Sequence, residues 1–331
     1  MGIIINDFVY GKYEIKEKVI EDLLKSKPIQ RIKQISQSGI PKEFDRPGQM
    51  HYSRYDHSVG VMLLLRRLGA SVEEQISGLL HDISHTAFSH TVDMIFGSYE
   101  KQSLQDSLHK SYFIDNDLKN ILNEYGYEAA RISNIKLFEL LERDIPDLCA
   151  DRLDYSLRDG VYDKQADIKE EISNLINRNG EIVFGSKEYA IKYGRLFVHL
   201  ERKLYANKEN TARRYVFAVA LKDALNSGVI SKEDLIYGVD QEIVEKIKNT
   251  KIKEIDNIIN GLKNNDFEVY DGGDVMLKVK LRYVNPKFVD KNGISTAMEV
   301  SREYKELVEN SIKEDKEGYL VKIKVGNIEI G

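Results

Sequence analysis

A short stretch of the chain holds most of its histidines, and this stretch limits how the chain can fold. Five of the seven histidines lie between positions 51 and 90, where an even spread would place about one. Five imidazole and carboxylate groups fall within residues 81–93, namely His81, Asp82, His85, His90 and Asp93. Core packing requires none of them, and burying them unpaired would cost several kcal/mol. The chain must therefore fold so that these groups meet a metal ion, an anion or one another.

The segment HSVGVMLLLRRLG (57–69) is predicted to form an apolar helix just before this cluster. It ends at Gly69, which suits the left-handed position that follows a helix. His57 begins the helix, and Asp56 before it is expected to be the helix cap rather than a metal ligand. Taken alone, His57 is equally well explained as a polar N-terminal residue that faces solvent.

A second helix is predicted to begin at Ser71, whose S-x-x-E spacing to Glu74 is that of a capping box. The apolar residues that follow at spacings of four, three and four form one buried stripe: Val72, Ile76, Leu79 and Ile83. His81 and Asp82 come at the end of this helix, and alone they are a polar pair at a helix end. The other members of the cluster follow at spacings of three and four, which allows shared helical faces.

A third element, DLCADRLDYSLRDG (147–160), carries a polar residue at every fourth position: Asp151, Tyr155 and Asp159. On a helix, positions four residues apart differ by only about 40° around the helix axis, so these three side chains line one face. The alternative is a solvated acidic face that pairs with Arg152 and Arg158. Periodicity alone favours that alternative.

Helices are predicted for most of the remaining chain. The predicted helical segments are 16–27, 28–37, 86–96, 101–110, 116–125, 135–142, 146–159, 194–226 and 232–262. In the segment 146–159, Pro146 is expected in the first turn and Gly160 just past the end. Residues 36–53 hold two prolines and two glycines, which indicates a long loop of the kind that usually carries function.

β-structure is predicted mainly at the two ends of the chain. Residues 1–15 look like an extended lead-in, a short hairpin is expected within 180–191, and the chain from about 265 onward alternates apolar and polar residues between Gly and Asn turns. We therefore expect a mainly α fold, with a helical domain over 1–225 and a small α+β region over 226–331.

Composition excludes several classes of function. The net charge of −5 excludes a general attraction to nucleic acids or acidic membranes, so an anionic substrate needs locally concentrated positive charge. Cys149 is the single cysteine, which excludes an internal disulfide and favours a reducing, cytoplasmic setting. No apolar run approaches the ~18 residues of a membrane span. The first residues also lack the basic and apolar regions of a signal peptide.

Four stretches together resemble the HD-domain phosphohydrolase superfamily, whose hallmark is His…His-Asp…Asp. They are QRIKQI (30–35), SRYDHSVGV (53–61), HDISHTAFSHTVD (81–93) and DRLDYSLRD (151–159). Within the superfamily they are most similar to the deoxynucleoside triphosphate triphosphohydrolases, which include bacterial dGTPases and the vertebrate SAM-and-HD-domain dNTPase. The resemblance covers roughly residues 5–225 and implies an HD-domain helical bundle. It also implies one divalent ion (Mn, Fe, Mg, Ni or Zn) with four protein ligands. These ligands would be His57, His81, Asp82 and Asp151.

The same resemblance implies three sets of residues that meet the substrate. The residues expected to handle protons beside the metal are His85, His90 and Asp93. The residues expected to contact phosphate are Arg54 and Arg152. The residues expected to contact the sugar are Gln34, Tyr155 and Asp159, with Tyr205 as a further pocket tyrosine.

The run from Ser84 to Ala87 departs from the family, in which glycines usually flank the second histidine, so the backbone near the phosphates is expected to differ. Three functions are open. The leading one is hydrolysis of a deoxynucleoside triphosphate to nucleoside and tripolyphosphate. The second is a metal-dependent phosphomonoesterase or phosphodiesterase, and the third is a non-catalytic nucleotide-sensing or nucleic-acid-binding module. The intact ligand set and the acidic charge argue against the third. Similar enzymes are frequently homo-oligomers, so self-association is an expectation by analogy.

Overall fold

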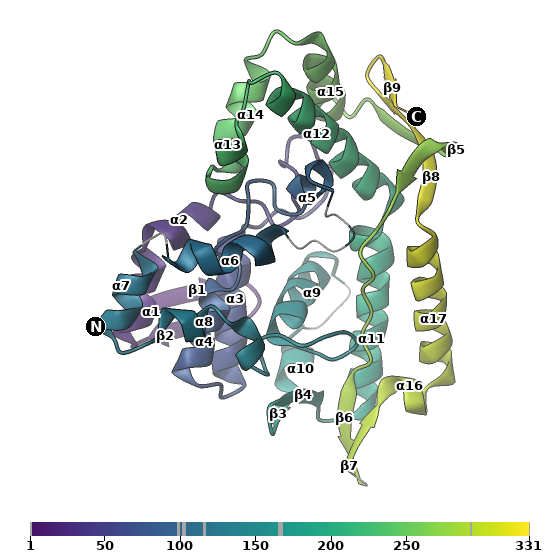
Figure 1. The fold of residues 1–331 in the computed structure, drawn as a ribbon. Coiled ribbons are helices and arrows are strands. Elements are labelled where there is room, and N and C mark those ends of the chain that lie inside the picture. Colours follow the sequence, from purple (N-terminus) through teal and green to yellow (C-terminus); the bar gives the residue numbers. More distant parts are fainter. Residues whose placement is uncertain are drawn as a thin grey trace.

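The structure is a computed structural model that describes residues 2–97, 100, 104–114, 117–164, 168–291 and 293–330. Within these residues the chain is mainly helical, and its strands form three small sheets (Figure 1). The prediction of a mainly α fold with a small α+β C-terminal region is confirmed. Among the described residues, no helix combines the length and the apolar character that crossing a membrane requires.

The chain begins with an antiparallel hairpin of β1 (Ile3–Asp7) and β2 (Gly11–Ile15), where the sequence predicted only an extended lead-in. Two short helices follow, α1 (Lys18–Lys25) and α2 (Lys27–Ile32). Residues 33–53 contain no helix, which confirms the predicted loop and shortens the predicted helix before it.

The middle of the chain folds into a series of helices, several of which carry residues of the predicted site. In chain order they are α3 (Arg54–Arg67), α4 (Val72–Leu80), α5 (Thr91–Ile95), α6 (Leu104–Ile114), α7 (Leu118–Glu124), α8 (Ala129–Ile132), the 3-10 turn η1 (Ile135–Leu137), α9 (Ala150–Tyr162) and α10 (Ile168–Ser173).

The remaining elements alternate helices with short strands. In chain order they are β3 (Leu175–Arg178), β4 (Glu181–Phe184), α11 (Lys187–Leu200), the π-helical turn η2 (Glu201–Tyr205), α12 (Lys208–Asn226), α13 (Lys232–Tyr237), α14 (Asp240–Lys248), α15 (Lys253–Lys263), β5 (Phe267–Leu277), β6 (Lys287–Asp290), β7 (Gly293–Thr296), α16 (Ala297–Val300), α17 (Arg302–Glu317), β8 (Tyr319–Val325) and β9 (Ile328–Ile330). A hairpin is present as predicted, but its bounds were wrong: it is β3–β4 and begins before residue 180, and α11 takes up residues 187–191 of the predicted range.

Helix α3 is buried on every side because it lies between two cores. Val61, Leu64 and Leu65 pack into a core shared with α9 and α11. Its Val59, Met62 and Leu63 pack into a second core shared with α1, α2 and α4. A helix that is apolar around its whole circumference is stable when it is enclosed in this way. The run VGVMLLL is therefore the sequence of a central helix.

The cap of α3 differs from the prediction. The Ser53 hydroxyl accepts a hydrogen bond from the Asp56 backbone N–H, and the Asp56 carboxylate accepts one from the Ser53 backbone N–H. The expected cap at Asp56 was wrong by three residues, because Asp56 is the reciprocal partner of a capping box. The predicted start of α4 is confirmed, since Ser71 accepts from the Glu74 N–H.

The boundaries predicted for α9 were also wrong. Cys149 is its N-cap, so Pro146 lies in the preceding loop and not in the first turn. Gly160 is inside the helix, where a Cβ would come within 3.0 Å of Leu196 Cδ2 on α11. The glycine therefore allows close helix packing and does not end the helix.

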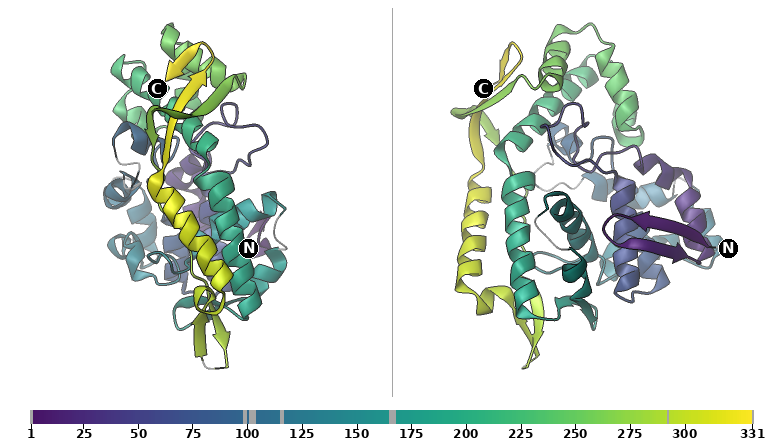
Figure 2. Two further views of the ribbon diagram at one scale, coloured as in Figure 1. Left: turned by 90° about the vertical axis from the view of Figure 1, so that its right-hand side faces the viewer. Right: turned by 180° about the vertical axis from the view of Figure 1, so that it is seen from behind.

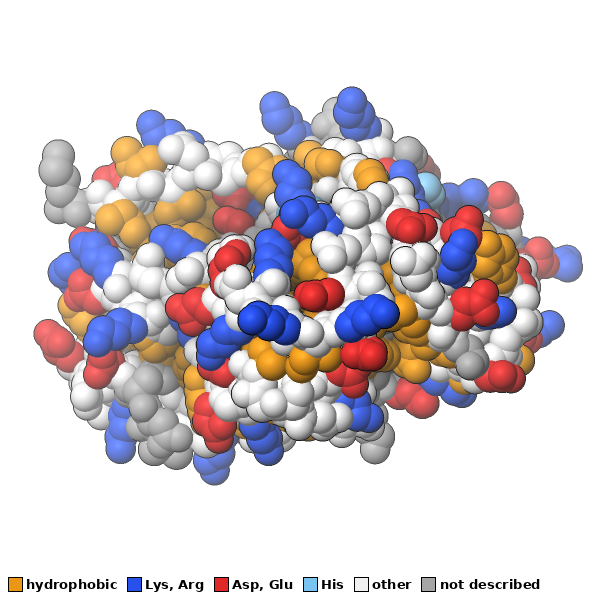
Figure 3. Space-filling view, turned by 90° about the horizontal axis from the view of Figure 1, so that it is seen from above, with side chains coloured by type: hydrophobic (Ala, Val, Ile, Leu, Met, Phe, Trp, Pro, Cys, Tyr) orange, Lys and Arg blue, Asp and Glu red, His pale blue; other side chains and the backbone are white. Residues whose placement is uncertain are grey.

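The C-terminal region is joined to the middle of the chain. Strand β6 pairs in parallel with β4, which gives one sheet with the order β3-β4-β6-β7. A second sheet has the order β5-β8-β9. Helix α17 lies alongside α11, as both views in Figure 2 show. On the face formed by the upper helices, Lys and Arg side chains are interspersed with Asp and Glu and form no continuous basic patch (Figure 3).

Helices α3 and α9 approach closely at Gly60. A Cβ there would lie 1.9 Å from Arg158 Nη2 and 2.1 Å from Asp154 Oδ1. Asp154 and Arg158 are fully buried and joined by a 2.7 Å hydrogen bond, and Arg158 also pairs with Asp7 of β1 at 2.7 Å. Glycine at position 60 therefore leaves room for a buried ion pair that crosses α3.

We expect Gly60→Ala to lower the free energy of unfolding by about 3–5 kcal/mol, because its methyl group would displace this buried ion pair. The measurement is denaturant unfolding. Ser58→Ala on the same helix is the control: the Ser58 hydroxyl is buried without a hydrogen-bond partner among the described residues, so its loss should change stability by less than about 1 kcal/mol. Equal effects of the two changes would contradict the steric explanation.

Candidate metal centre

His57 joins α3 to α9 through two hydrogen bonds. Its ring is fully buried, with Nδ1 2.7 Å from Asp154 Oδ2 and Nε2 2.9 Å from Asp151 Oδ1. Positions 151 and 154 are three apart, so both carboxylates project from the face of α9 that meets α3. Burial opposes protonation of the ring, but the hydrogen bonds to Asp151 and Asp154 outweigh burial and raise the pKa of His57 to about 9.

His81 lies at the end of α4 and faces His57, with 3.3 Å between their Nε2 atoms. Its Nδ1 is 2.7 Å from the carbonyl oxygen of Gly78. A carbonyl can only accept, so Nδ1 carries the proton and the lone pair of the neutral ring is on Nε2. That nitrogen is 3.7 Å from Asp151 Oδ1. His57, His81 and Asp151 thus offer three donor atoms within 4.8 Å of one another.

These three atoms fit a single divalent ion. Two donor atoms that each lie about 2.1 Å from one ion are at most about 4.2 Å apart. The observed separations of 2.9, 3.3 and 3.7 Å are within that limit. Asp154 and the Gly78 carbonyl hold the far nitrogens of the two rings and so fix both ring orientations, as partners of metal-binding histidines do.

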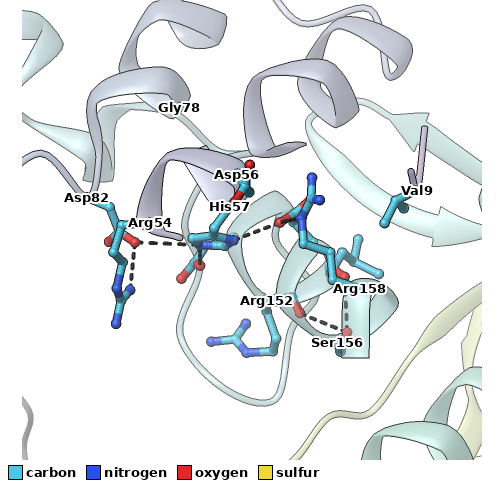
Figure 4. Close-up of polar contacts among 12 residues, drawn as sticks. Val9, Arg54, Asp56, His57, Gly78, Asp82, Arg152, Ser156 and Arg158 are labelled. Atoms are coloured by element: carbon cyan, nitrogen blue, oxygen red, sulfur yellow. Dashed lines mark hydrogen bonds and ion pairs between the residues drawn. The ribbon is translucent and has the colours of Figure 1, made fainter. Parts of the chain in front are cut away.

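Asp82 stands beside this group and has other partners (Figure 4). Its Oδ2 accepts a 2.6 Å hydrogen bond from Arg54 Nη1, and its Oδ1 is 3.3 Å from His85 Nε2. The carboxylate also comes within 3.5 Å of His81 Nε2 and 3.8 Å of His57 Nε2. Burial opposes ionisation, but Arg54 outweighs it and keeps the pKa of Asp82 well below its usual range. Its role as a fourth ligand stays a prediction.

The residues expected to handle protons are brought together next to Asp82. The rings of His85 and His90 meet edge to face, with centroids 4.9 Å apart. His90 Nδ1 is 3.1 Å from Asp93 Oδ2, so Nδ1 donates and Nε2 keeps a lone pair. Burial lowers the pKa of His85 to about 4 and that of His90 to about 3. Both imidazoles are therefore neutral at physiological pH.

The two arginines expected at phosphate approach the site from different helices. Arg54 on α3 is buried and also donates to Ser89 Oγ at 3.0 Å. Arg152 on α9 donates to the carbonyl oxygens of Asp147 at 2.5 Å and Arg143 at 3.2 Å. Carbonyl partners satisfy the guanidinium donors without cancelling the positive charge. Figure 4 shows the side chains of Arg54 and His57, both from α3, together with Arg152 from α9.

Three of the four residues expected at the sugar form a cluster. Tyr205 donates to Asp159 Oδ2 at 2.7 Å, and its ring meets that of Tyr155 edge to face at 5.4 Å. The Tyr155 ring lies 6.4 Å from the His57 ring. Burial raises the pKa of Asp159 to about 7, although the Tyr205 hydrogen bond acts in the opposite direction. Gln34, the fourth, follows α2 with an exposed side chain and has no side-chain hydrogen bond to this cluster among the described residues.

Sequence reasoning missed Asp154, which binds the far side of His57. Asp154 is not part of the four-residue repeat of Asp151, Tyr155 and Asp159, so the periodicity did not select it. The local hint was Gly60, a glycine inside an apolar helix, which often marks close backbone approach. Only the packing of α3 on α9 makes Asp154 the partner of the His57 ring.

The loop that departs from the family pattern is held by contacts from outside it. Ser84 Oγ is 2.9 Å from His109 Nδ1, and the Thr86 hydroxyl donates to the Ser89 carbonyl oxygen at 3.1 Å. Neither Ser84 nor Thr86 has a positive φ, so neither position requires glycine. In the stretch from His85 to His90, the residues with positive φ are Phe88 and Ser89, at 57° and 47°.

Comparisons with known proteins agree with this site. A family model described as the HD domain matches residues 54–159, a span that begins at Arg54 and ends at Asp159. The chain is 34% identical over 326 residues to the uncharacterised protein YdhJ of Bacillus subtilis, covering 96% of this chain and 98% of that protein. It is 28% identical over 294 residues to the metal-dependent phosphohydrolase cns2 of Cordyceps militaris, covering 86% of this chain and 84% of that protein.

More distant similarities point the same way. The chain is 23% identical over 326 residues to the deoxynucleoside triphosphate triphosphohydrolase SAMHD1 homolog of Dictyostelium discoideum, covering 85% of this chain and 62% of that protein. A solved phosphohydrolase structure from Bacteroides thetaiotaomicron has the same fold, with a TM-score of 0.68, 18% identity and coverage of 98% of this chain and 100% of that one.

The chain therefore belongs to the HD-domain family of metal-dependent phosphohydrolases. It is an enzyme that uses a divalent metal ion and acts on a phosphorylated substrate.

We expect Asp154→Asn to weaken metal binding by about 10- to 100-fold, because a neutral amide holds the His57 ring less firmly and makes its Nε2 a poorer ligand. Metal bound per chain, measured after dialysis against a weak chelator, tests this. Asp56→Asn is the control, since Asp56 adjoins His57 in the chain but its side chain serves the α3 cap. Unchanged metal content in Asp154→Asn would contradict the assignment.

Asp159 gives a pH-dependent prediction. An aspartate in the unfolded chain titrates near about pH 3.9, whereas burial raises the folded pKa of Asp159 to about 7. The folded state thus binds the extra proton, and stability falls as pH rises between these values, by up to about 4 kcal/mol. We expect Asp159→Asn to gain stability relative to wild type from pH 4 to 7 and no further above pH 8. Exposed Asp274→Asn, followed by thermal unfolding over the same range, should show no such trend.

Proposed function

We propose that this phosphohydrolase converts a deoxynucleoside triphosphate to a nucleoside and tripolyphosphate. The observation that carries the proposal is the cluster of Tyr155, Asp159 and Tyr205 beside the candidate metal centre, with the Tyr155 ring 6.4 Å from the His57 ring. A carboxyl group flanked by aromatic rings offers both a hydrogen-bond partner and an apolar wall. That combination suits a deoxyribose whose phosphate end lies at the metal.

The phosphate end of the substrate would meet neutral imidazoles and positive charge. When bound, the divalent ion supplies Lewis-acid polarisation of the phosphate. His90 donates through Nδ1 to Asp93 and therefore offers Nε2 as a proton acceptor. Arg54 and Arg152 would stabilise phosphate oxygens through charge-assisted hydrogen bonds.

The relatives support the reaction class more strongly than the substrate. The printed name of the Cordyceps militaris relative goes no further than metal-dependent phosphohydrolase. The Dictyostelium discoideum relative carries the name of a deoxynucleoside triphosphate triphosphohydrolase, but this chain covers only 62% of it. The choice of a deoxynucleoside triphosphate therefore rests on the cluster of Tyr155, Asp159 and Tyr205, the sugar-side cluster.

A second function is a phosphomonoesterase or phosphodiesterase that acts on another phosphorylated substrate. The observation in its favour is the loop from Ser84 to Ala87, whose side chains differ from those usual in the triphosphohydrolases and make their own hydrogen bonds. A nucleic-acid-binding role has no comparable support, since the net charge is −5 and the face in Figure 3 mixes both signs.

The test loads the purified protein with Mn, Fe, Mg, Ni or Zn in turn and offers each deoxynucleoside and ribonucleoside triphosphate. We expect tripolyphosphate and nucleoside from at least one deoxynucleotide, with both products measured by chromatography. Inorganic phosphate as the product would favour the second function, and no turnover with any pair would contradict the proposal.

His81→Ala should lose the metal and at least about 100-fold of the activity, because it removes one of the three donor atoms. His199→Ala is the matched control, since His199 is exposed on α11 and pairs with Asp163. Asp82→Ala should likewise abolish turnover, and full activity of that variant would show that the ligand assignment is wrong.

A further inference from the structure

The loop that carries His85 and His90 packs against the C-terminal helices. The side chains of Ala87 and Phe88, between the two histidines, are fully buried in a core to which α12, α14 and α15 contribute. The Phe88 ring meets the Phe217 ring of α12 edge to face, with centroids 4.9 Å apart. The two histidine rings instead meet each other, also 4.9 Å apart. The loop therefore joins the site to helices that follow far along the chain.

The corner between α13 and α14 holds this loop by its backbone. The Ala87 N–H donates to the Leu235 carbonyl oxygen at 2.9 Å. Arg31 donates to the Gly238 carbonyl oxygen at 2.9 Å and to the His85 carbonyl oxygen at 2.5 Å. The guanidinium group thus links the corner to the residue at which the loop begins.

Asp240, in the first turn of α14, binds two separate segments with one carboxylate. Its Oδ1 accepts a 2.7 Å hydrogen bond from the Phe88 N–H, and its Oδ2 accepts a 2.8 Å hydrogen bond from the Ser36 N–H. The residue is only 8% exposed. An acidic residue in the first turn stabilises its own helix through the helix dipole alone. Here both oxygens bind backbone outside α14, so the side chain has a further role.

The two segments are also joined to each other, and the joint reaches Arg54. The Ser89 hydroxyl donates to the Ser36 carbonyl oxygen at 2.7 Å and accepts from Arg54 Nε at 3.0 Å. Arg54 in turn donates to Asp82 Oδ2 at 2.6 Å. The carboxylate of Asp240 and the two serines therefore close a ring of hydrogen bonds through the backbone. This ring supports an arginine that is expected to bind phosphate.

The backbone conformation of the loop explains why it needs such support. Phe88 and Ser89 have φ values of 57° and 47°, a region that residues other than glycine seldom adopt. Such conformations persist when the surrounding structure over-determines them, and they gather at functional sites. The hydrogen bonds of Asp240 and Ser89 supply this constraint. The placement of His90 relative to His85 therefore depends on the ring.

We propose that Asp240 is a positioning residue for the reaction, which holds the histidines of this loop and Arg54 in the geometry that turnover requires. The inference rests on the proposed function in one respect, since it takes the histidines to handle protons and Arg54 to bind phosphate. It assigns a role to a residue outside the span 54–159 that the HD-domain model matches. In the competing explanation, Asp240 only joins α14 to the rest of the fold.

The experiment compares Asp240→Asn with Glu242→Gln in the metal-loaded protein. An asparagine has one carbonyl oxygen, so its amino group would face one of the two N–H groups that the carboxylate binds. Glu242 lies in the same turn with an exposed side chain, and its substitution removes the same charge, so it is a matched control. The substrates are the deoxynucleoside triphosphates and para-nitrophenyl phosphate.

We expect Asp240→Asn to lower kcat about 10- to 100-fold with a smaller change in KM, because misplaced groups slow the chemical step. Glu242→Gln should behave as wild type does. Steady-state kinetics, at a temperature where both variants are folded, measure both constants. Equal losses in the two variants would show that the charge of the α14 terminus matters and would overturn the proposal.

Two further measurements separate positioning from structure. Amide hydrogen exchange without substrate should become about tenfold faster or more at Phe88 and Ser36 in Asp240→Asn, and should not change in Glu242→Gln. Bound metal should stay at the wild-type level, because none of the three donors of the metal centre belongs to the ring. Loss of metal, or a wild-type kcat despite faster exchange, would identify a structural role alone and overturn the proposal.

Ser89→Ala tests the same ring without a change in α14. It removes the hydrogen bonds to Ser36 and Arg54, so kcat should fall in this variant as well. In the double variant with Asp240→Asn, the loss should be smaller than the product of the two single losses, and losses that multiply would contradict a shared network. If Asp240→Asn does not fold, Ser89→Ala decides: a lower kcat at full metal content supports the proposal, and an unchanged kcat overturns it.

The outcomes also distinguish this inference from the proposed function. If wild type cleaves para-nitrophenyl phosphate but no deoxynucleoside triphosphate, the proposed function fails, and the same variants still decide the role of Asp240 on that substrate. If wild type cleaves a deoxynucleoside triphosphate and Asp240→Asn keeps its kcat, only the role of Asp240 is overturned. If wild type cleaves neither probe with any metal, both proposals fail.

Discussion

The buried ring of His57 connects charges from three parts of the chain. One nitrogen meets Asp151 and the other meets Asp154, and Asp154 in turn holds Arg158, which reaches Asp7 in the first strand. Negative and positive groups alternate along this line, so each buried charge faces an opposite one. Buried ion pairs compensate for their desolvation only when every member is present. The packing of α3 on α9 and the position of the N-terminal hairpin therefore depend on the same interaction that orients a metal-binding ring.

The site also answers the requirement set by the acidic composition. A chain with a net charge of −5 can attract a polyphosphate only where its cations gather. Arg54 comes from α3, Arg152 from α9, and Arg282, whose guanidinium carbon lies 5.9 Å from the centre of the Tyr205 ring, from the segment between β5 and β6. No two of these elements are adjacent in the chain. The positive charge near the metal is thus a product of tertiary structure and cannot be seen in any local window of the sequence.

Local patterns were enough to predict the residues that share one helix or one helix end. The four-residue repeat of Asp151, Tyr155 and Asp159 predicts a common face of α9, and Ser71 with Glu74 predicts the start of α4; the structure has both. The resemblance to a known family was needed to choose a metal site over a solvated acidic face, because periodicity favoured the latter. Sequence reasoning could not find groups whose role depends on packing. Asp154 matters because α3 lies against it and brings the His57 ring within 2.7 Å of its carboxylate.

Residue 225 is the predicted end of the helical domain. Contacts between residues before and after it show that the helical domain alone does not define the site. The Asp240 carboxylate at the start of α14 accepts the Ser36 N–H at 2.8 Å and the Phe88 N–H at 2.7 Å. It thereby ties the long loop before α3 to the loop that follows Asp82. Phe88 adopts a positive φ of 57°, which costs a non-glycine residue roughly 1–2 kcal/mol. The hydrogen bond from its N–H to a buried carboxylate offsets that cost. The conformation of the loop between His85 and His90 is therefore imposed in part by α14, far along the chain from either histidine.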